Sequence, residues 1–563
     1  ARVARPGEPL DLRGPAQLLT EAGVSMPLGD RVPAGLQPGY HVVQGRDGTE
    51  TPLIVSPGVC PRPGGRAWGW AVQLHCVRSG ESWGIGDLDD LRRLGRWSAE
   101  LGAGLLVLSP LHAPAPTSPQ EPSPYFPSSR LFRNPLHLAL ERVPGAERLG
   151  ARLAGLLEAG RALNSSRRID RDRVLALKME ALEALWERFG GATGFDEYRR
   201  SRGLQEYATY CALAELHGPA WRRWPARFRH PRSPAVADFA RALAGRVGFH
   251  AWLQWLLDAQ LEEAAREIPL MQDLAVGFSL DGADAWAWQD LLAPGVEVGA
   301  PPDEFNTGGQ RWGLAPFDPW KLRSAGYGPY IDTLRACLRH GAGLRIDHVM
   351  GLFRLFWIPA GAGPESGAYV TYPARDLLDI LALESARAGA YVVGEDLGTV
   401  DEAVRSELAA RSVLSYRVLW FEARPTSRYP SRALAAITTH DLPTVAGLMT
   451  GSDLALQERL GLGPNLDGAL VMRRRLLGAA GLPEGAGLEE VLEAAHRALA
   501  RCPSVLVVAC LEDLAGVAER PNMPGTTRPE NWSLALPSTL EEMAADARSA
   551  RLARALRRDS QPA

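Results

Sequence analysis

Three acidic residues stand at the ends of three short apolar segments of this 563-residue chain. Asp347 ends the segment GLRID, Glu395 ends VVGE, and Asp441 lies in ITTHD. They are 48 and 46 positions apart, so no single helix can carry them on one face. The carboxyl ends of the strands of a parallel barrel meet at one mouth, where such side chains converge. Capping of a following helix is the alternative explanation for each acid taken alone.

Two carboxyl groups at one mouth suit glycosyl transfer with retention at the anomeric carbon. One carboxylate attacks that carbon and forms an ester, while the second protonates the departing oxygen and later deprotonates the incoming hydroxyl. Because Arg345 stands two positions before Asp347 on the same side of a strand, its guanidinium is expected to keep that carboxylate ionised and oriented. Burial of Glu395 beside other carboxylates would raise its pKa, as the acid of this reaction requires.

The residue that follows each of these two acids faces the other side of its strand. His348 follows Asp347, and Asp396 follows Glu395. We therefore expect His348 and Asp396 to serve the structure and not the chemistry.

Strand-like and helical segments alternate along most of the chain and would position the acids. Helical spacing of apolar residues occurs at 88–103, 330–341 and 376–389. Eight apolar runs of strand length are found at 70–76, 105–110, 273–280, 343–350, 390–397, 415–422, 435–442 and 504–511. This alternation predicts an α/β fold, a (β/α)8 TIM barrel. A doubly wound open sheet is the alternative.

The same patterns predict how the chain is divided. The catalytic barrel is expected over 66–540, interrupted by a large helical insertion at 138–262. Residues 1–65 are rich in Pro and Gly and predict a small β-rich N-terminal segment, in which 39–43 and 50–55 form a hairpin around an Asp-Gly turn. Residues 541–563 are expected to form a helical tail.

Composition excludes several classes of function. Lys+Arg 62 against Asp+Glu 65 gives a net charge of -3, so no cationic field favours nucleic acid. No apolar run is long enough for a membrane span. The six cysteines show no CxxC spacing, and no His/Cys/Asp cluster or phosphate-binding loop is present, so neither a metal nor another cofactor is expected. Reduced cysteines and the lack of an apolar leader at the N-terminus predict a cytoplasmic protein. The oligomeric state is not indicated.

Several motifs together resemble a known family. The segments around the three acids, GLRIDH, VVGEDLG and THDLPT, are similar to the strand-four, strand-five and strand-seven regions of the α-amylase superfamily. The fuller resemblance, over residues 66–540, is to the bacterial 4-α-glucanotransferases (amylomaltases, or disproportionating enzymes). It is carried by SWGIGDL (82–88), SPYFPSS (123–129), DLAVGFSLDGADAW (273–286), GAPPDEFNTGGQRWG (299–313) and NMPGTTRPENW (522–532).

This resemblance implies a role for each acid. Asp347 would be the nucleophile, Glu395 the general acid and base, and Asp441 the carboxylate that distorts and stabilises the bound sugar. Substrate-binding positions implied in the same way are Ser123, Tyr125, Asp281, Asp303, Phe305, Gln310, Trp312, Arg345 and His440. His440 would hydrogen-bond the same sugar ring and Tyr125 would stack on it. A core histidine and ordinary loop residues are the alternative readings of these positions.

The segment 297–316 resembles the flexible lid of that family. Its aromatic residues Phe305 and Trp312 would bind the apolar faces of glucose units, while Asp303 and Gln310 would contact hydroxyl groups. A lid also excludes water, which competes with a sugar hydroxyl for the glycosyl-enzyme. The alternative is an exposed loop whose aromatic residues pack onto the barrel.

The function implied is retaining transfer of α-1,4-glucan segments, through an ester on Asp347, to the 4-hydroxyl of an acceptor glucan or glucose. The expected partners are α-1,4-glucans and maltooligosaccharides. An α-glucan hydrolase with the same three carboxylates is one alternative, and a non-catalytic glucan-binding protein is another.

Overall fold

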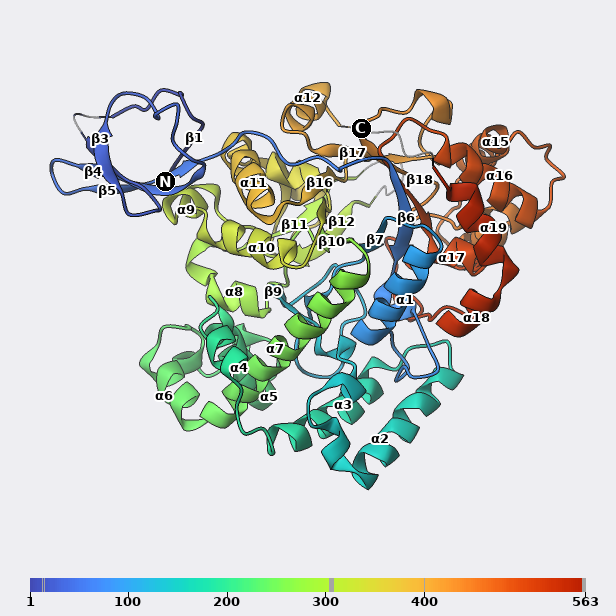
Figure 1. Cartoon of the computed structure of the whole chain (residues 1–563), viewed down its shortest axis with the longest axis horizontal. Coiled ribbons are helices and arrows are strands. Elements are labelled where there is room, and N and C mark those ends of the chain that lie inside the picture. Colours follow the sequence, from blue (N-terminus) through green and yellow to red (C-terminus); the bar gives the residue numbers. More distant parts are fainter. Residues whose placement is uncertain (13, 15, 303–307, 399, 559–563) are drawn as a thin grey trace.

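A closed barrel of eight parallel strands lies at the centre of the computed structural model, which describes residues 1–563 except 13, 15, 303–307, 399 and 559–563 (Figure 1). In their order around the barrel the strands are β10 (Leu270–Leu274), β13 (Gly343–Ile346), β16 (Tyr391–Gly394), β17 (Leu414–Val418), β18 (Ala433–Ala436), β19 (Leu506–Cys510), β6 (Ala67–Val72) and β7 (Leu105–Leu108). Each contains part of one of the eight predicted runs or, for β10, its first two residues. The predicted barrel is therefore confirmed.

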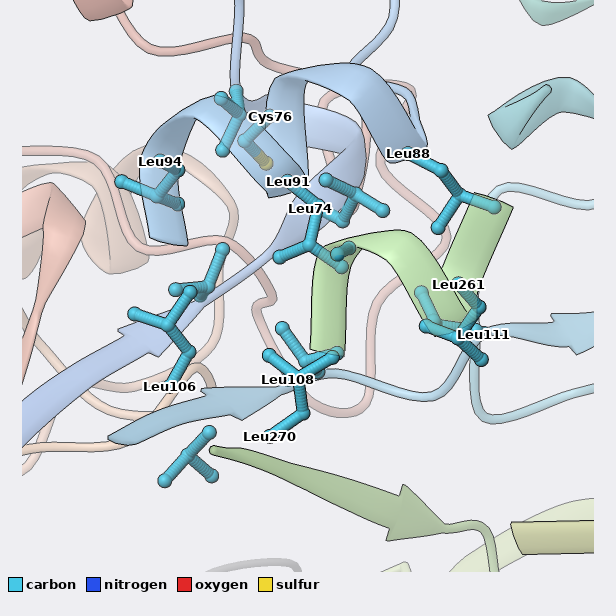
Figure 2. Packing of buried hydrophobic residues seen from close by; sticks show 14 of the residues in the cluster. Leu74, Cys76, Leu88, Leu91, Leu94, Leu106, Leu108, Leu111, Leu261 and Leu270 are labelled. Carbon is cyan, nitrogen blue, oxygen red and sulfur yellow. The ribbon is translucent and has the colours of Figure 1, made fainter. Parts of the chain in front are cut away.

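Buried leucines pack between the barrel wall and the helices that cover it. Leu88, Leu91 and Leu94 stand three residues apart on α1 (Leu88–Glu100) and are all buried. Figure 2 shows them near leucines of β7 and the long helix α7 (Ala244–Glu267). Burying one such side chain contributes about 1.5–3 kcal/mol relative to leaving it exposed to water.

One predicted strand, 273–280, is misplaced. β10 spans Leu270–Leu274, in register with β7 and β13. Beyond it the chain turns away along the barrel mouth, where the Arg130 guanidinium donates to the carbonyl oxygens of Ala275 and Val276 at 3.0 and 3.1 Å. Because Phe278 is nevertheless fully buried, the apolar pattern continues past the end of the strand.

Helices α2 to α7 lie between β7 and β10 and occupy the segment expected to be helical. The first five are α2 (Ala151–Ala162), α3 (Arg171–Trp186), α4 (Thr193–Tyr198), α5 (Leu204–His217) and α6 (Pro234–Ala242). The last helix, α7, runs five residues beyond the expected end at 262.

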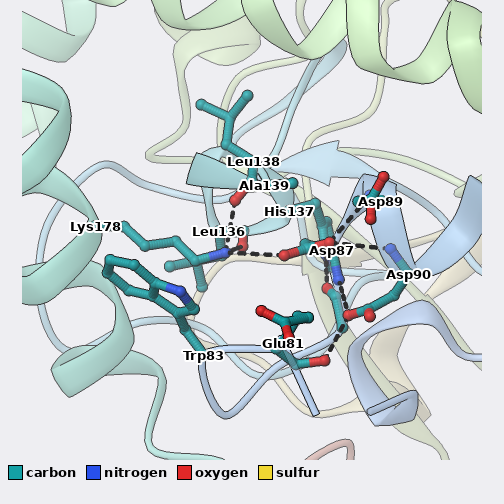
Figure 3. Close-up of polar contacts among 12 residues, drawn as sticks. Glu81, Trp83, Asp87, Asp89, Asp90, Leu136, His137, Leu138, Ala139 and Lys178 are labelled. Carbon is teal, nitrogen blue, oxygen red and sulfur yellow. Dashed lines mark hydrogen bonds and ion pairs between the residues drawn. The ribbon is translucent and has the colours of Figure 1, made fainter. Parts of the chain in front are cut away.

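A buried lysine joins this insertion to the barrel (Figure 3). Lys178, on α3, is fully buried, and its ammonium group donates to the carbonyl oxygens of Leu136 and Leu138, at 2.7 Å each. Its Nζ lies 3.9 Å from Oδ2 of Asp87, the N-cap of α1. Burial lowers the pKa of Lys178, while the charge of Asp87 opposes that shift.

The N-terminal residues form a five-stranded sheet of order β1-β5-β4-β2-β3. Its strands are β1 (Arg2–Ala4), β2 (Ala16–Leu19), β3 (Ser25–Leu28), β4 (Gly39–Gly45) and β5 (Glu50–Val55). The predicted hairpin is confirmed, since β4 and β5 pair antiparallel. Arg5, directly after β1, forms an ion pair of 2.7 Å with the buried Asp379 of α11 (Ala374–Ala388).

A second sheet follows β10 in the sequence. It has the order β12-β11-β14-β15, with β11 (Val296–Ala300), β12 (Gln310–Leu314), β14 (Arg354–Pro359) and β15 (Ala368–Thr371). The segment 297–316, expected to be a lid loop, therefore includes most of β11 and all of β12. A short pair of strands, β8 (His112–Ala113) and β9 (Ser129–Arg133), lies beside the loop that carries Tyr125.

The other helices mostly surround the barrel. They are α8 (Ala283–Ala287), α9 (Pro319–Ser324), α10 (Gly328–Leu338), α12 (Glu402–Ala410), α13 (Val445–Thr450), α14 (Ser452–Arg459), α15 (Leu466–Ala480), α16 (Leu488–Ala500), α17 (Leu511–Leu514), α18 (Leu540–Ala545) and α19 (Ala547–Leu556). Of the helices in the described part of the chain, none combines the length and the apolar character that a membrane crossing requires.

Candidate active site

Two of the predicted acids follow directly on adjacent strands of the barrel. Asp347 comes after β13 and Glu395 after β16, and the last residues of these strands are paired in register. The amide of Glu395 donates to the carbonyl oxygen of Ile346 at 3.0 Å, so the two acids stand side by side on the same rim. Asp441 lies five residues after β18, on the same rim.

Arg345 connects the nucleophile position to the neighbouring strand. Its guanidinium is buried and donates through Nη2 to Oδ1 of Asp347 at 3.0 Å. Through Nη1 it also donates to both carboxylate oxygens of Asp273 at 2.7 Å. The contact of Arg345 with Asp347 is the one that the strand spacing indicates. Asp273 shares the cation and holds it from the other side.

The pKa values of the two adjacent acids are both raised. Burial raises the pKa of Asp347 to about 6 and outweighs the Arg345 charge, which lowers it. The charges of Asp273 and Glu395 raise it further. Arg345 therefore offsets the effect of burial only in part, and Asp347 is still mostly ionised at pH 7. Burial also raises the pKa of Glu395.

The backbone holds Glu395 in place. Its Oε2 accepts a hydrogen bond from the amide of His348 at 3.0 Å, and its Oε1 accepts one from the amide of Leu397 at 2.8 Å. His348 adopts a left-handed conformation with φ of 46°. Asp396 is buried and accepts a hydrogen bond from the amide of Tyr416 at 2.9 Å.

Asp441 carries a donor on each carboxylate oxygen. Oδ2 lies 3.3 Å from Nε2 of His440, and Oδ1 accepts a hydrogen bond from the side-chain amide of Asn522 at 2.7 Å. The partial burial of Asp441 acts to raise its pKa, but His440 and Asn522 bring the pKa below its ordinary value. The pKa of His440 is raised in return, because the attraction of Asp441 outweighs burial. Asp441 is therefore the acid of the three that stays ionised to the lowest pH.

Three aromatic rings form one wall of the site. The ring centroid of Tyr125 lies 4.8 Å from that of His440 and 5.4 Å from that of Trp532, and His440 and Trp532 are 5.0 Å apart. The Tyr125 hydroxyl donates to Oδ2 of Asp273 at 2.7 Å. Burial raises the pKa of Tyr125 far above 10, so this hydroxyl stays a donor. A small cavity lies beside Tyr125 and His440. Its lining includes Gln73, Tyr125, Asp273, Arg345, His440 and Glu512.

Two other predicted binding residues, Ser123 and Asp281, make contacts within the protein. The Ser123 hydroxyl accepts a hydrogen bond from the amide of Tyr125 at 3.3 Å, which shapes the loop below that ring. Asp281 pairs with Arg222 at 2.8 Å, and its side chain is partly exposed.

Two predicted residues of the second sheet contact each other. On β12, the indole of Trp312 donates to the amide oxygen of Gln310 at 3.2 Å, and its ring lies edge-on to His348 at 5.5 Å. Asp303 and Phe305, predicted in the same segment, lie outside the described residues.

Asp273, Asn522 and Trp532 were not among the predicted site residues. The predicted strand 273–280 begins at Asp273 and would put this residue at the opposite rim, whereas Asp273 is the fourth residue of β10. Asn522 and Trp532 belong to a motif of the resemblance, but no spacing rule links them to the barrel mouth.

Elsewhere in the described part of the chain, no candidate metal centre is found. The structure, as far as it is described, contains no cluster of three or more His, Cys, Asp or Glu that could hold a metal ion. All six cysteines are buried free thiols.

Comparisons with known proteins agree on one family. The family model described as 4-alpha-glucanotransferase matches residues 72–540. A 4-alpha-glucanotransferase of Mycobacterium tuberculosis is 43% identical over 93% of this chain and 80% of its own. One of Haemophilus influenzae is 36% identical over 73% of this chain and 64% of its own.

Solved structures give the same picture. The crystal structure of amylomaltase from Corynebacterium glutamicum covers 99% of this chain and 90% of its own, with a TM-score of 0.88 and 32% identity. An amylomaltase from Streptococcus agalactiae in complex with acarbose shares the fold, with a TM-score of 0.72 and 19% identity over 87% of this chain and 98% of its own.

Proposed function

The chain belongs to the 4-α-glucanotransferase family and is an enzyme that transfers glucan segments, and we propose that it does so through an ester on Asp347. The observation that carries this assignment is the position of Asp347 and Glu395 on adjacent strand ends, with Arg345 bound to Asp347. Retaining transfer needs two such carboxyl groups close together, one ionised and one protonated.

In the first step, an oxygen of Asp347 attacks the anomeric carbon of a donor α-1,4-glucan. The bond to the departing 4-oxygen breaks as Glu395 gives that oxygen its proton. In the second step, ionised Glu395 takes the proton from the 4-hydroxyl of an acceptor glucan or glucose. The acceptor oxygen attacks the same carbon, and the Asp347 carboxylate leaves.

Asp441 stabilises the sugar in the transition states of these steps. The transition state resembles an oxocarbenium ion, so its positive charge is favoured by an ionised carboxylate nearby. The lowered pKa of Asp441 supports this role, because the group stays ionised throughout the working pH range. His440 would hydrogen-bond the same ring, and Tyr125 would stack on it.

The remaining binding positions lie either around the nucleophile and the bound sugar or on the acceptor side. Arg345 orients the nucleophile, and Ser123 sets the loop that carries Tyr125. Asp281 would bind sugar hydroxyls while sharing its charge with Arg222. Gln310 and Trp312, beside His348, would bind the acceptor side together with Asp303 and Phe305, and segment 297–316 would close over it.

We propose α-1,4-glucans and maltooligosaccharides as the substrates and the cytoplasm as the location. The family assignment supports the substrate class, and so does the acarbose complex of the Streptococcus agalactiae amylomaltase. The location is supported by six unpaired thiols, the form that a reducing compartment maintains.

Incubation with maltotriose tests the reaction. Transfer gives a ladder of longer and shorter oligosaccharides plus glucose at a constant number of reducing ends. The hydrolase alternative predicts a steady rise in reducing ends without longer products. A non-catalytic glucan-binding protein would give neither, and it would lose no property when Asp347 is changed to Asn. We expect Asp347→Asn to reduce turnover by about a thousandfold or more, and a loss below about tenfold would contradict the assignment.

A further inference from the structure

A strap formed by residues 517–533 connects α17 to the segment before α18 and passes beside the barrel mouth. Both of its ends are fixed. The hydroxyl of Thr444, before α13, donates to the carbonyl oxygen of Val517 at 2.7 Å. At the other end, the buried Arg171 of α3 donates to the hydroxyl of Ser533 at 3.0 Å. The path of the strap is therefore set from two different parts of the fold.

The strap delivers three hydrogen-bond donors to two consecutive residues of the site. The side-chain amide of Asn522 donates to Oδ1 of Asp441 at 2.7 Å, and its backbone amide donates to the carbonyl oxygen of His440 at 3.0 Å. Nη1 of Arg520 donates to the carbonyl oxygen of Asp441 at 2.8 Å. Both the peptide and the carboxylate of Asp441 are thus held from one side.

Arg520 is itself rigidly held. Its Nε donates to Oδ1 of Asp453 at 2.7 Å, and the side chains of this pair are 8% and 4% exposed. A buried, bidentate ion pair of this kind leaves the guanidinium little freedom. Asn522 is two residues further along, so its amide is presented to Asp441 from a fixed backbone.

Asp441 needs such a support more than the other two acids. Asp347 is held by Arg345, and Glu395 by two backbone amides. The side chain of Asp441 is 43% exposed, and the only other group on its carboxylate in the described structure is His440, at 3.3 Å. Loss of the Asn522 amide would leave Oδ1 without a protein donor among the described residues.

We infer that Asn522 is a positioning residue of the transfer reaction, whose side-chain amide holds the carboxylate of Asp441 in the orientation that stabilises the transition state. This inference rests on the proposed function of Asp441. It concerns kcat more than substrate binding, because an interaction made mainly in the transition state changes kcat and leaves KM nearly unchanged.

The isosteric change Asn522→Asp distinguishes this role from a structural one. It keeps the size of the side chain and the backbone donor to His440, but it replaces the amide donor by an oxygen that repels Asp441. Asn522→Ala removes the donor without adding a charge. We expect kcat for maltotriose disproportionation to fall about 10- to 100-fold in Asn522→Ala and further in Asn522→Asp, with KM within about threefold of wild type. Inhibition by acarbose should weaken in parallel with kcat.

Asn465→Asp is the matched control. Asn465 caps α15 through its side-chain oxygen, which accepts a hydrogen bond from the amide of Gly468 at 2.7 Å, and Asp caps helices equally well. Its kcat should equal that of wild type. Melting temperatures of the three variants show whether each is folded. If Asn522→Asp does not fold, the kcat of Asn522→Ala tests the inference.

Two results would overturn the inference. A wild-type kcat in Asn522→Asp would mean that the residue only shapes the strap, and a raised KM at unchanged kcat would mean that it binds sugar directly. Failure of the proposed function is distinguishable, because wild-type enzyme would then make no oligosaccharide ladder at all.

Discussion

Arg345 donates to Asp347 and, with shorter bonds, to Asp273 on the neighbouring strand. The cation therefore does not neutralise the nucleophile alone, because two carboxylates share it. Burial and the nearby charges then bring the pKa of Asp347 to about 6. The site therefore combines a nucleophile whose pKa lies just below neutral pH with an acid, Glu395, whose pKa is also raised.

The pH dependence of activity follows from these shifts. Asp347 must be ionised to attack, and its pKa lies above the ordinary value, so kcat/KM should fall as the pH drops through about 6. Below that pH we expect kcat/KM to fall about tenfold for each pH unit. Initial rates with maltotriose between pH 4 and pH 8 measure this. An acidic limb centred near pH 4 would show that Asp347 is not the group that titrates.

Asp273→Asn should lower kcat and shift the acidic limb of the pH–rate profile. The neutral side chain binds Arg345 less strongly and holds the Tyr125 hydroxyl differently, so we expect kcat to fall about 10- to 100-fold. Because the Asp273 charge raises the pKa of Asp347, its removal should move the acidic limb to lower pH. A pH–rate profile of the variant gives both values. A limb that moves to higher pH would contradict the shared-cation arrangement.

Asp273 also illustrates what the sequence could and could not predict. The eight strands could be predicted, because strands buried on both faces read as continuous apolar runs. The end of β10 could not, because the loop after it includes the buried Phe278 and continues the apolar pattern. This error of a few residues moved Asp273 to the wrong rim.

The acids at strand ends could be predicted for a similar reason. Asp347 and Glu395 directly follow buried strands, so barrel geometry alone brings them together. Asn522 and Trp532 could not be placed, since their proximity to Asp441 and Tyr125 depends on the path of residues 517–533 across the mouth. No local pattern encodes such a path.

A buried acid below the site should make stability depend on pH. Burial raises the pKa of Glu512 to about 7 from an ordinary 4.5. Its contribution to the free energy of unfolding is thus fully present below about pH 4.5 and is lost as the pH rises through about 7. Glu512→Gln removes this loss and should stabilise the protein by about 1–3 kcal/mol at pH 8, with little effect at pH 5. Chemical denaturation at both pH values measures the difference.

The matched control is Glu458→Gln, at an exposed position of α14. It should leave the free energy of unfolding unchanged at both pH values. Equal stability of Glu512→Gln and wild type at pH 8 would contradict the raised pKa.

Lys178→Met should destabilise the contact between the helical insertion and the barrel. The change leaves two buried carbonyl oxygens and Asp87 without their cation, and loss of one partner of a buried charge pair costs about 3–5 kcal/mol. Thermal unfolding followed by circular dichroism measures this. The chain contains one other lysine, the exposed Lys321, and Lys321→Met should unfold at the wild-type temperature. Equal melting temperatures for the two variants would contradict a stabilising role of Lys178.

The covalent intermediate on Asp347 is the central claim, and mass spectrometry of a trapped enzyme tests it most directly. In Glu395→Gln, an α-maltosyl fluoride can still form the ester, because fluoride leaves without an acid, whereas release is slow without a base. Brief incubation followed by digestion should give a maltosyl adduct on the peptide that contains Asp347. An adduct on another residue, or turnover of the fluoride with no adduct at any time, would contradict the account.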